Sequence, residues 1–107
     1  MPVRALDDRS FDAYVGEPAV VAFVRGQHGA CKAVRTMLEA LAPLHEPRVG
    51  FATVDVQDAP ALAIRFAIDD VPTVILFDDY RGVGRLTAPI GRSELELLIA
   101  ERLGGSG

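Results

Sequence analysis

Cysteine is almost absent from this chain, since Cys31 is the one cysteine among its 107 residues. A single cysteine excludes a disulfide within the chain, and this fits a reducing compartment. A domain of this length can bury roughly two thirds of the surface that its unfolded chain exposes, which is enough to fold without disulfides or a zinc framework. We therefore expect one domain that relies on its hydrophobic core.

The chain also lacks long apolar runs and blocks of like charge. No apolar stretch approaches the ~18 residues of a membrane span, and residues 1–8 do not resemble a signal peptide. Eleven basic and fifteen acidic residues give a formal net charge of −4, without a basic stripe interleaved with aromatics. The composition argues against nucleic acid and membranes as partners and predicts a cytoplasmic protein.

Hydrophobic periodicity and turn residues divide the chain into alternating helices and strands. No internal repeat or linker interrupts them, so we assign residues 1–103 to one domain and the Gly-rich residues 104–107 to a flexible tail. The first two strands are expected to be parallel because a helix separates them, and the last two to form a hairpin. The expected elements are helices over 11–15, 30–42, 59–68 and 93–103, and strands over 20–24, 49–56, 72–77 and 83–87.

Polar residues and prolines predict where these helices begin and end. Ser10 and Asp58 are residues of the kind that cap helix N-termini, and Ser93 and Glu96 have the spacing of a capping box. Pro43 is expected to stop the second helix, because proline lacks the N–H group that a helix interior needs.

Apolar residues at helical spacing predict which helix faces are buried. On the second helix the charged residues Lys32, Arg35 and Glu39 are then expected to face water. The residues expected to supply apolar surface are Leu62, Ile64, Phe66 and Ile68 on the third helix, and Leu95, Leu98, Ile99 and Leu103 on the last.

The segment that joins the first of these strands to the second helix carries the most informative motif. It reads Gln27-His28-Gly29-Ala30-Cys31-Lys32 and is similar to the Trp-Cys-Gly-Pro-Cys-Lys active site of the thioredoxin family. Val71-Pro72-Thr73 resembles the family's Ile-Pro-Thr, whose proline is cis and lies beside the active-site cysteine. The resemblance covers nearly the whole chain. It implies an α/β thioredoxin fold, with a central mixed sheet flanked by helices on both faces, and a cis bond before Pro72.

The motif departs from the family at the position that carries the chemistry. His28 stands at the first cysteine, which in the family is the exposed attacking thiolate, and Cys31 stands at the second, more buried one. Gln27 replaces the tryptophan and Ala30 the proline. A chain with one cysteine cannot close the family's disulfide within itself, so the resemblance indicates a degenerate HGAC site.

Three further positions differ from the family in the same sense. Ala22 stands where the family keeps a buried Asp that relays a proton to the resolving thiol, and Thr53 stands where a Lys usually accompanies that Asp. Ala88 occupies the position of the Gly that opens the groove for the substrate peptide. These changes together argue against a simple oxidoreductase.

Cys31 and His28 each have two interpretations. Cys31 is either a semi-buried packing residue or a monothiol that forms a mixed disulfide, with a neutral His28 taking its proton. His28 is otherwise a solvated residue at a helix start. A metal site built from these two residues and His45 is a weak hypothesis, because structural zinc takes four ligands at recognisable spacing. We expect neither a metal nor a cofactor.

The leading hypothesis is a protein-binding or chaperone-like module that holds a polypeptide client without a reactive sulfur. Thioredoxin-like co-chaperones that keep only the second cysteine are similar in this respect. Hydrogenase-expression chaperones are similar at Tyr80-Arg81-Gly82-Val83, at Arg65-Phe66 and in the closing helix. The surface expected to bind the partner consists of Gln27, His28, Gly29, Ala30, Val71, Pro72 and Thr73.

Two other functions remain open from the sequence. One is a monothiol thiol-disulfide or glutathione-linked oxidoreductase, which needs an accessible Cys31 thiolate and an external thiol to resolve the adduct. The other is a structural or regulatory subunit that docks through an exposed apolar patch.

Overall fold

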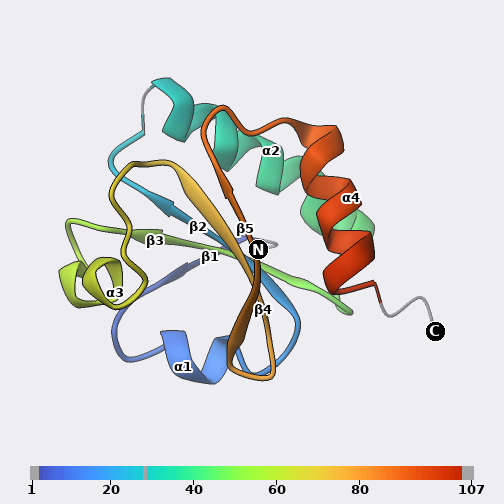
Figure 1. The fold of residues 1–107 in the computed structure, drawn as a ribbon, viewed down its shortest axis with the longest axis horizontal. Coiled ribbons are helices and arrows are strands. Elements are labelled where there is room, and N and C mark those ends of the chain that lie inside the picture. Colours follow the sequence, from blue (N-terminus) through green and yellow to red (C-terminus); the bar gives the residue numbers. More distant parts are fainter. Residues whose placement is uncertain (1–2, 28, 105–107) are drawn as a thin grey trace.

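A computed structural model describes residues 3–27 and 29–104 of the chain. Along this part helices and strands alternate as the sequence predicts, with one additional strand at the start (Figure 1). The elements are β1 Val3–Leu6, α1 Phe11–Tyr14, β2 Ala19–Val24, α2 Gly29–His45, β3 Gly50–Asp55, α3 Pro60–Arg65, β4 Thr73–Asp78, β5 Arg81–Thr87 and α4 Arg92–Arg102.

The strands form a five-stranded mixed sheet in the order β1-β3-β2-β4-β5. β1 and β2 pair with β3 in parallel, as predicted for β2 and β3, while β4 runs antiparallel to β2 and forms the predicted hairpin with β5. The sequence analysis missed β1, because only Leu6 of its four residues is buried. A strand at the edge of a sheet with one buried side chain has little of the alternation that identifies strands.

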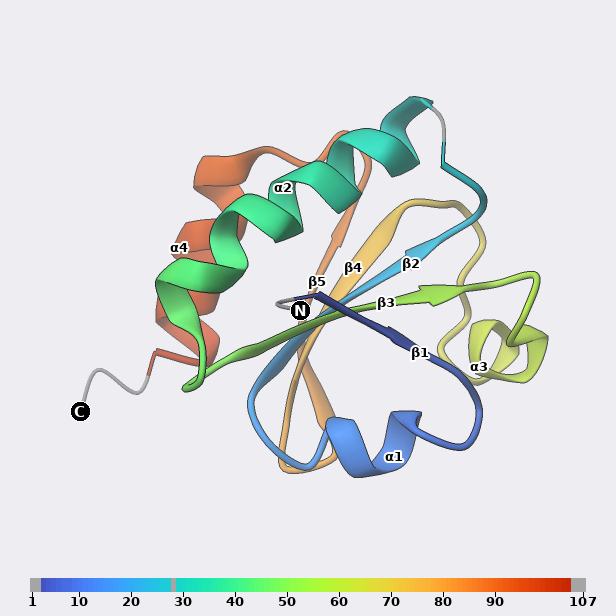
Figure 2. The same ribbon diagram turned by 180° about the vertical axis from the view of Figure 1, so that it is seen from behind.

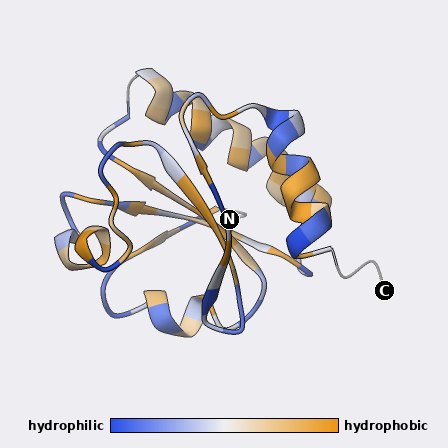
Figure 3. Cartoon of the chain, in the orientation of Figure 1, coloured by the Kyte–Doolittle hydropathy of each residue, from blue (hydrophilic) through white to orange (hydrophobic). Residues whose placement is uncertain are grey.

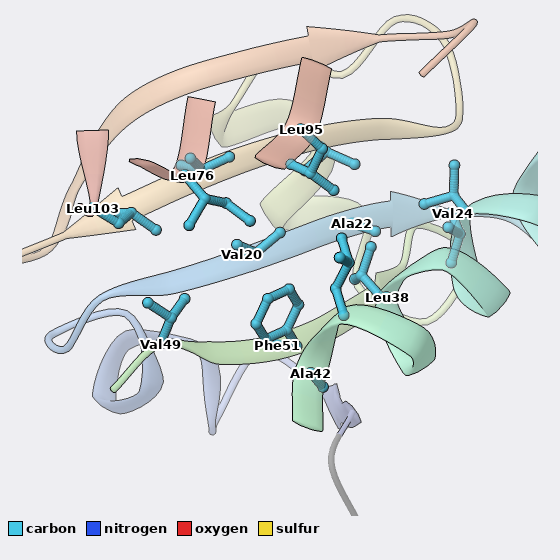
Figure 4. Packing of buried hydrophobic residues seen from close by; sticks show 14 of the residues in the cluster. Val20, Ala22, Val24, Leu38, Ala42, Val49, Phe51, Leu76, Leu95 and Leu103 are labelled. Carbon is cyan, nitrogen blue, oxygen red and sulfur yellow. The ribbon is translucent and has the colours of Figure 1, made fainter. Parts of the chain in front are cut away.

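Helices cover both faces of the sheet, as the thioredoxin fold requires (Figures 1 and 2). β2 lies at the centre, and all six of its residues are buried. Alternate side chains of β2 enter two separate cores: Val20, Ala22 and Val24 pack with α2 and α4, and Ala19, Val21 and Phe23 pack with α1 and α3. Figure 3 shows apolar residues along the central strands, and Figure 4 shows the core beneath α2 and α4.

Proline residues have effects that the sequence analysis anticipated only in part. Pro43 does not stop α2, which continues to His45. Leu41 and Ala42 in the same turn are fully buried, and their packing offsets the hydrogen bond that the proline cannot donate. The Val71–Pro72 bond is cis, as expected, and the bonds before Pro47 and Pro89 are cis as well.

The predicted cap at Ser10 has the right position but the wrong chemistry. Ser10 is the N-cap of α1, yet its hydroxyl donates to Asp7 Oδ1 at 3.0 Å instead of capping the helix. Asp7 Oδ1 also accepts the backbone N–H groups of Ser10 and Arg9 at 3.0 Å each. These bonds, the Ser10 backbone N–H first, hold the pKa of Asp7 below its usual range.

The other two predicted caps are wrong by one or two residues. The N-cap of α3 is Ala59 rather than Asp58, and Pro60 occupies the first helical position, where a missing N–H is tolerated. The N-cap of α4 is Gly91 rather than Ser93, and Glu94 Oε1 accepts the Gly91 N–H at 3.4 Å. No helix among the described residues is long and apolar enough to cross a membrane.

The apolar centre of the sheet gives the first prediction. Ala22 is fully buried between Thr53 of β3 and Val74 of β4, so Ala22→Asp places a carboxyl group in the core. Burial raises the pKa of such a group, so the folded state holds its proton to higher pH than the unfolded state, and stability falls as pH rises above about 4. We expect Ala22→Asp to lower the free energy of unfolding by on the order of 4 kcal/mol at pH 8 and by less at pH 5.

Urea unfolding at the two pH values measures this difference. Ala40→Asp, on the exposed side of α2, is the control and should cost less than about 1 kcal/mol at either pH. An equal loss for Ala22→Asp at pH 5 and pH 8 would contradict the account of a dry core at this position.

Candidate functional site

The motif begins where β2 leaves the centre of the sheet. The chain turns through Gly26 (φ 66°) and Gly29 (φ 60°), and Gly29 opens α2. Both glycines occupy the left-handed region, which residues with a Cβ rarely adopt. His28, predicted as a candidate proton acceptor and binding residue, lies outside the described residues.

The described motif residues divide into an exposed rim and a buried thiol. Gln27, Gly29 and Ala30 are exposed. Cys31 is only 6% exposed and belongs to the core beneath α2 and α4, together with Ala22. The cysteine is therefore sheltered, as its position in the motif leads one to expect.

A small polar cluster holds the turn that precedes the motif. Arg35 Nε donates to the Gly26 carbonyl at 3.2 Å, and Arg35 Nη2 lies 4.0 Å from Asp55 Oδ2. The same carboxylate oxygen accepts the Gly26 N–H at 3.4 Å. Gly26, at the centre of this turn, is thus hydrogen-bonded through both its N–H and its carbonyl group.

The sequence pattern does not reveal this cluster, because helical spacing predicts that Arg35 faces water. The Arg35 side chain is instead only 25% exposed. A usable signal was nevertheless present: Asp55 ends β3, and the C-terminal ends of the parallel strands β2 and β3 meet at one edge of the sheet. An acidic residue there is within reach of the turn that follows β2.

The second marker, Val71-Pro72-Thr73, is mostly covered. Val71 is half-buried, whereas Pro72 and Thr73 are buried, and Thr73 Oγ1 donates to the Asp70 carbonyl at 2.7 Å. Of the predicted binding residues in this segment, Val71 therefore offers the most side-chain surface.

An arginine also holds the loop that leads to this segment. Arg85 of β5 donates from Nη1 to the Phe66 carbonyl at 2.8 Å and from Nη2 to the Ala67 carbonyl at 2.9 Å, just past the end of α3. Ala67 itself has a positive φ of 52°. The fork of one guanidinium group therefore fixes the start of the loop between α3 and β4.

A groove of about 450 Å³ lies between the turn after β2 and the loop after α3. These two segments lie close together in both ribbon views (Figures 1 and 2). Ile64 on the groove wall is 81% exposed, which corrects the expectation that it packs in the core. The lining residues are Arg25, Val56, Pro60, Ala63, Ile64, Ile68, Asp69, Asp70 and Val71.

The positions that resemble the family's Asp and Lys hold side chains that do not ionise. Ala22 and Thr53 are register partners in neighbouring strands, and both are buried. A small hollow of about 210 Å³ reaches Thr53 from the side of Gln27 and Arg35. Ala88 is exposed, immediately after β5.

The hypothetical metal site cannot combine Cys31 and His45. They lie fourteen positions apart on α2, which is roughly 21 Å along a helix axis, far beyond the reach of one metal ion. Within residues 3–27 and 29–104 no three His, Cys, Asp or Glu side chains are grouped to hold a metal.

Comparison with known proteins agrees with the fold. The thioredoxin family model matches residues 2–101, and the chain therefore belongs to the thioredoxin family. Its single cysteine leaves no partner thiol in these 107 residues for the dithiol exchange that two cysteines perform.

Several bacterial thioredoxins are similar over most of the chain. A thioredoxin of Alicyclobacillus acidocaldarius subsp. acidocaldarius is 30% identical over 100 residues, covering 92% of this chain and 95% of its own length. Thioredoxin C-2 of Corynebacterium nephridii is 28% identical over 99 residues, covering 90% and 92%. The bifunctional thioredoxin reductase/thioredoxin of Mycobacterium leprae (strain TN) is 33% identical over 91 residues, covering 82% of this chain but 20% of that longer protein.

The burial of Cys31 predicts a slow reaction with alkylating reagents. We expect iodoacetamide to label the native chain at least tenfold more slowly than the urea-unfolded chain, because only 6% of the residue is exposed. Intact mass against time measures both rates.

A matched control keeps the helix and moves the thiol by one residue. Cys31→Ala combined with Ala30→Cys places the single cysteine at an exposed position and should label in the folded state nearly as fast as when unfolded. Equal native and unfolded rates for the natural Cys31 would show that its thiol is accessible.

Proposed function

We propose that this thioredoxin-family chain is a protein-binding, chaperone-like module whose HGAC segment is a degenerate form of the dithiol site. The observation that carries the proposal is the contrast at the motif. Cys31 is buried, while Gln27, Gly29 and Ala30 are exposed. The groove formed by Arg25, which precedes the motif, and by Val71 of the second marker has the 81% exposed Ile64 in its wall. The exposed surface can bind a polypeptide, whereas the buried sulfur is not accessible for thiol exchange.

Thiol chemistry has two requirements that this arrangement does not favour. Exchange needs a thiolate that can approach the sulfur of the other molecule and a second thiol to resolve the mixed disulfide. Cys31 lies in an apolar core to which β2 contributes Ala22, a residue that cannot ionise. A monothiol oxidoreductase using Cys31 is therefore the second choice.

The groove favours an extended polypeptide with an apolar side chain. Ile64, Ile68 and Val71 supply apolar wall, so a side chain that enters the groove removes apolar surface from water on both partners. The lining also includes the basic residue Arg25 and the acidic residues Asp69 and Asp70. Charges of both signs would give a bound polypeptide a preferred direction.

The segment that resembles hydrogenase-expression chaperones does not contribute to this surface. Tyr80 lies in the turn between β4 and β5, Arg81 begins β5, and β4 runs antiparallel to β2. The turn therefore lies at the end of the sheet opposite the motif. We propose a cytoplasmic polypeptide client in general, because a chain with one cysteine needs no oxidising compartment.

The binding prediction distinguishes binding by the exposed surface from binding that needs the Cys31 thiol. Reduced, carboxymethylated α-lactalbumin is a permanently unfolded polypeptide without free thiols, and labelled material reports binding by fluorescence anisotropy. We expect Cys31→Ala to bind with unchanged affinity and Ile64→Asp to bind at least tenfold more weakly, because a charged group replaces the exposed apolar wall.

Leu97→Asp is the matched control. Leu97 is also exposed (61%), but it lies on α4, which packs on the opposite face of the sheet from α3. The proposal fails if Leu97→Asp and Ile64→Asp weaken binding equally, if the natural chain does not bind, or if Cys31→Ala abolishes binding.

A further inference from the structure

A second pocket lies at the opposite end of the sheet from the motif. It has a volume of about 390 Å³ and is formed where α1, β2 and β3 meet the end of α2. Its volume is within the range of pockets that hold small ligands and peptide side chains. Its lining residues are Ala13, Tyr14, Glu17, Pro18, Glu46, Pro47 and Gly50.

Tyr14 forms a fixed aromatic wall in this pocket. Its hydroxyl donates to the Phe51 carbonyl at 3.2 Å, and its ring lies against Gly50. A Cβ on Gly50 would stand 2.4 Å from the tyrosine oxygen, so glycine is what lets the ring lie there. A tyrosine hydroxyl is protonated at neutral pH at its ordinary pKa, and burial, followed by the charge of Glu46, raises the pKa of Tyr14 further.

The backbone around the pocket is also tied together. The Gly50 N–H donates to the Pro18 carbonyl at 2.9 Å, which joins the segment after α2 to the segment before β2. Pro18 and Pro47 add two rigid rings to the lining. Because these groups are already held in place, a ligand that enters the pocket does not have to immobilise them. The entropy cost of binding is therefore smaller.

The charges at the pocket are negative. Glu17 and Glu46 are its two ionisable carboxyl groups, and within the described residues neither lies within 4.0 Å of a basic nitrogen. The C-terminal end of the 17-residue helix α2 adds its partial negative charge beside Glu46. Arg4 does contact the lining, because its guanidinium lies 5.8 Å from the centre of the Tyr14 ring.

We propose that this pocket binds a basic peptide segment, with an arginine or lysine side chain directed at Glu17 and Glu46 and a neighbouring apolar residue against Tyr14, Pro18 and Pro47. Charge complementarity selects the cation, and the aromatic and proline rings accept the aliphatic part of the chain. The Tyr14 ring already has the Arg4 guanidinium beside it, so the incoming cation is directed at the two carboxylates and not at the ring.

This site is separate from the surface proposed for polypeptide binding. β2 runs from Ala19, next to the pocket, to Val24, next to the motif, so a strand of six residues, about 20 Å, lies between them. The two proposals can therefore fail independently.

Amide shifts in NMR spectra of the ¹⁵N-labelled chain test the pocket directly. The probe is acetyl-Gly-Leu-Arg-Leu-Gly-amide, and the comparison peptide has norleucine in place of arginine. We expect saturable shifts at Tyr14 and Gly50, and at least tenfold weaker binding of the norleucine peptide. Glu17→Gln with Glu46→Gln should weaken binding of the arginine peptide at least tenfold, and Gly50→Ala should weaken it by displacing Tyr14.

Two control variants separate this site from other effects. Glu101→Gln removes the same charge from an exposed position on α4, and Ile64→Asp alters the groove beside the motif; neither should change the affinity. The single variant Glu17→Gln, at an exposed position, keeps the test valid if the double variant does not fold. Equal affinity for the two peptides, no loss in the glutamate variants, no saturation up to 5 mM peptide, or shifts centred on Gly29 and Val71 would each overturn the proposal.

Discussion

The burial of β2 on both faces is the constraint on which the rest of the structure depends. Each of its six side chains enters one of two cores, and its backbone pairs with β3 on one side and β4 on the other. A strand held in this way has a fixed register and direction. Its C-terminal end therefore places the turn at Gly26, the motif and the start of α2 at one end of the molecule.

The same core determines what the motif can do. Cys31 lies in the first turn of a helix whose buried face packs on β2, so its side chain belongs to the same core as Ala22 and is shielded from solvent. The residues before it remain outside. Two arginines, Arg35 and Arg85, hold the backbone on either side of the adjoining groove through carbonyl groups. The chain is thus a thioredoxin-family scaffold with an exposed motif rim, an adjoining groove and a buried thiol.

Much of this could be predicted from the sequence. The central strands are predicted by the apolar runs at 20–24 and 72–77, and the helix that covers them by the helical spacing after Ala30. Both predictions succeed because long periodic segments indicate burial directly. Strand β1 and the helix ends were missed, since four residues carry little pattern and packing carried α2 past Pro43. The roles of Arg35 and Arg85 depend on contacts between residues 9 to 20 positions apart, which local patterns do not report.

The central claim is that polypeptides are held beside the motif without participation of sulfur. Site-specific photocrosslinking in a Cys31→Ala chain tests it most directly, with benzoylphenylalanine at position 27 or, as a control, at position 97. The account predicts that reduced, carboxymethylated α-lactalbumin is crosslinked from position 27 and not from position 97. Loss of the crosslink at position 27 when Cys31 is replaced, or equal crosslinking from both positions, would contradict it.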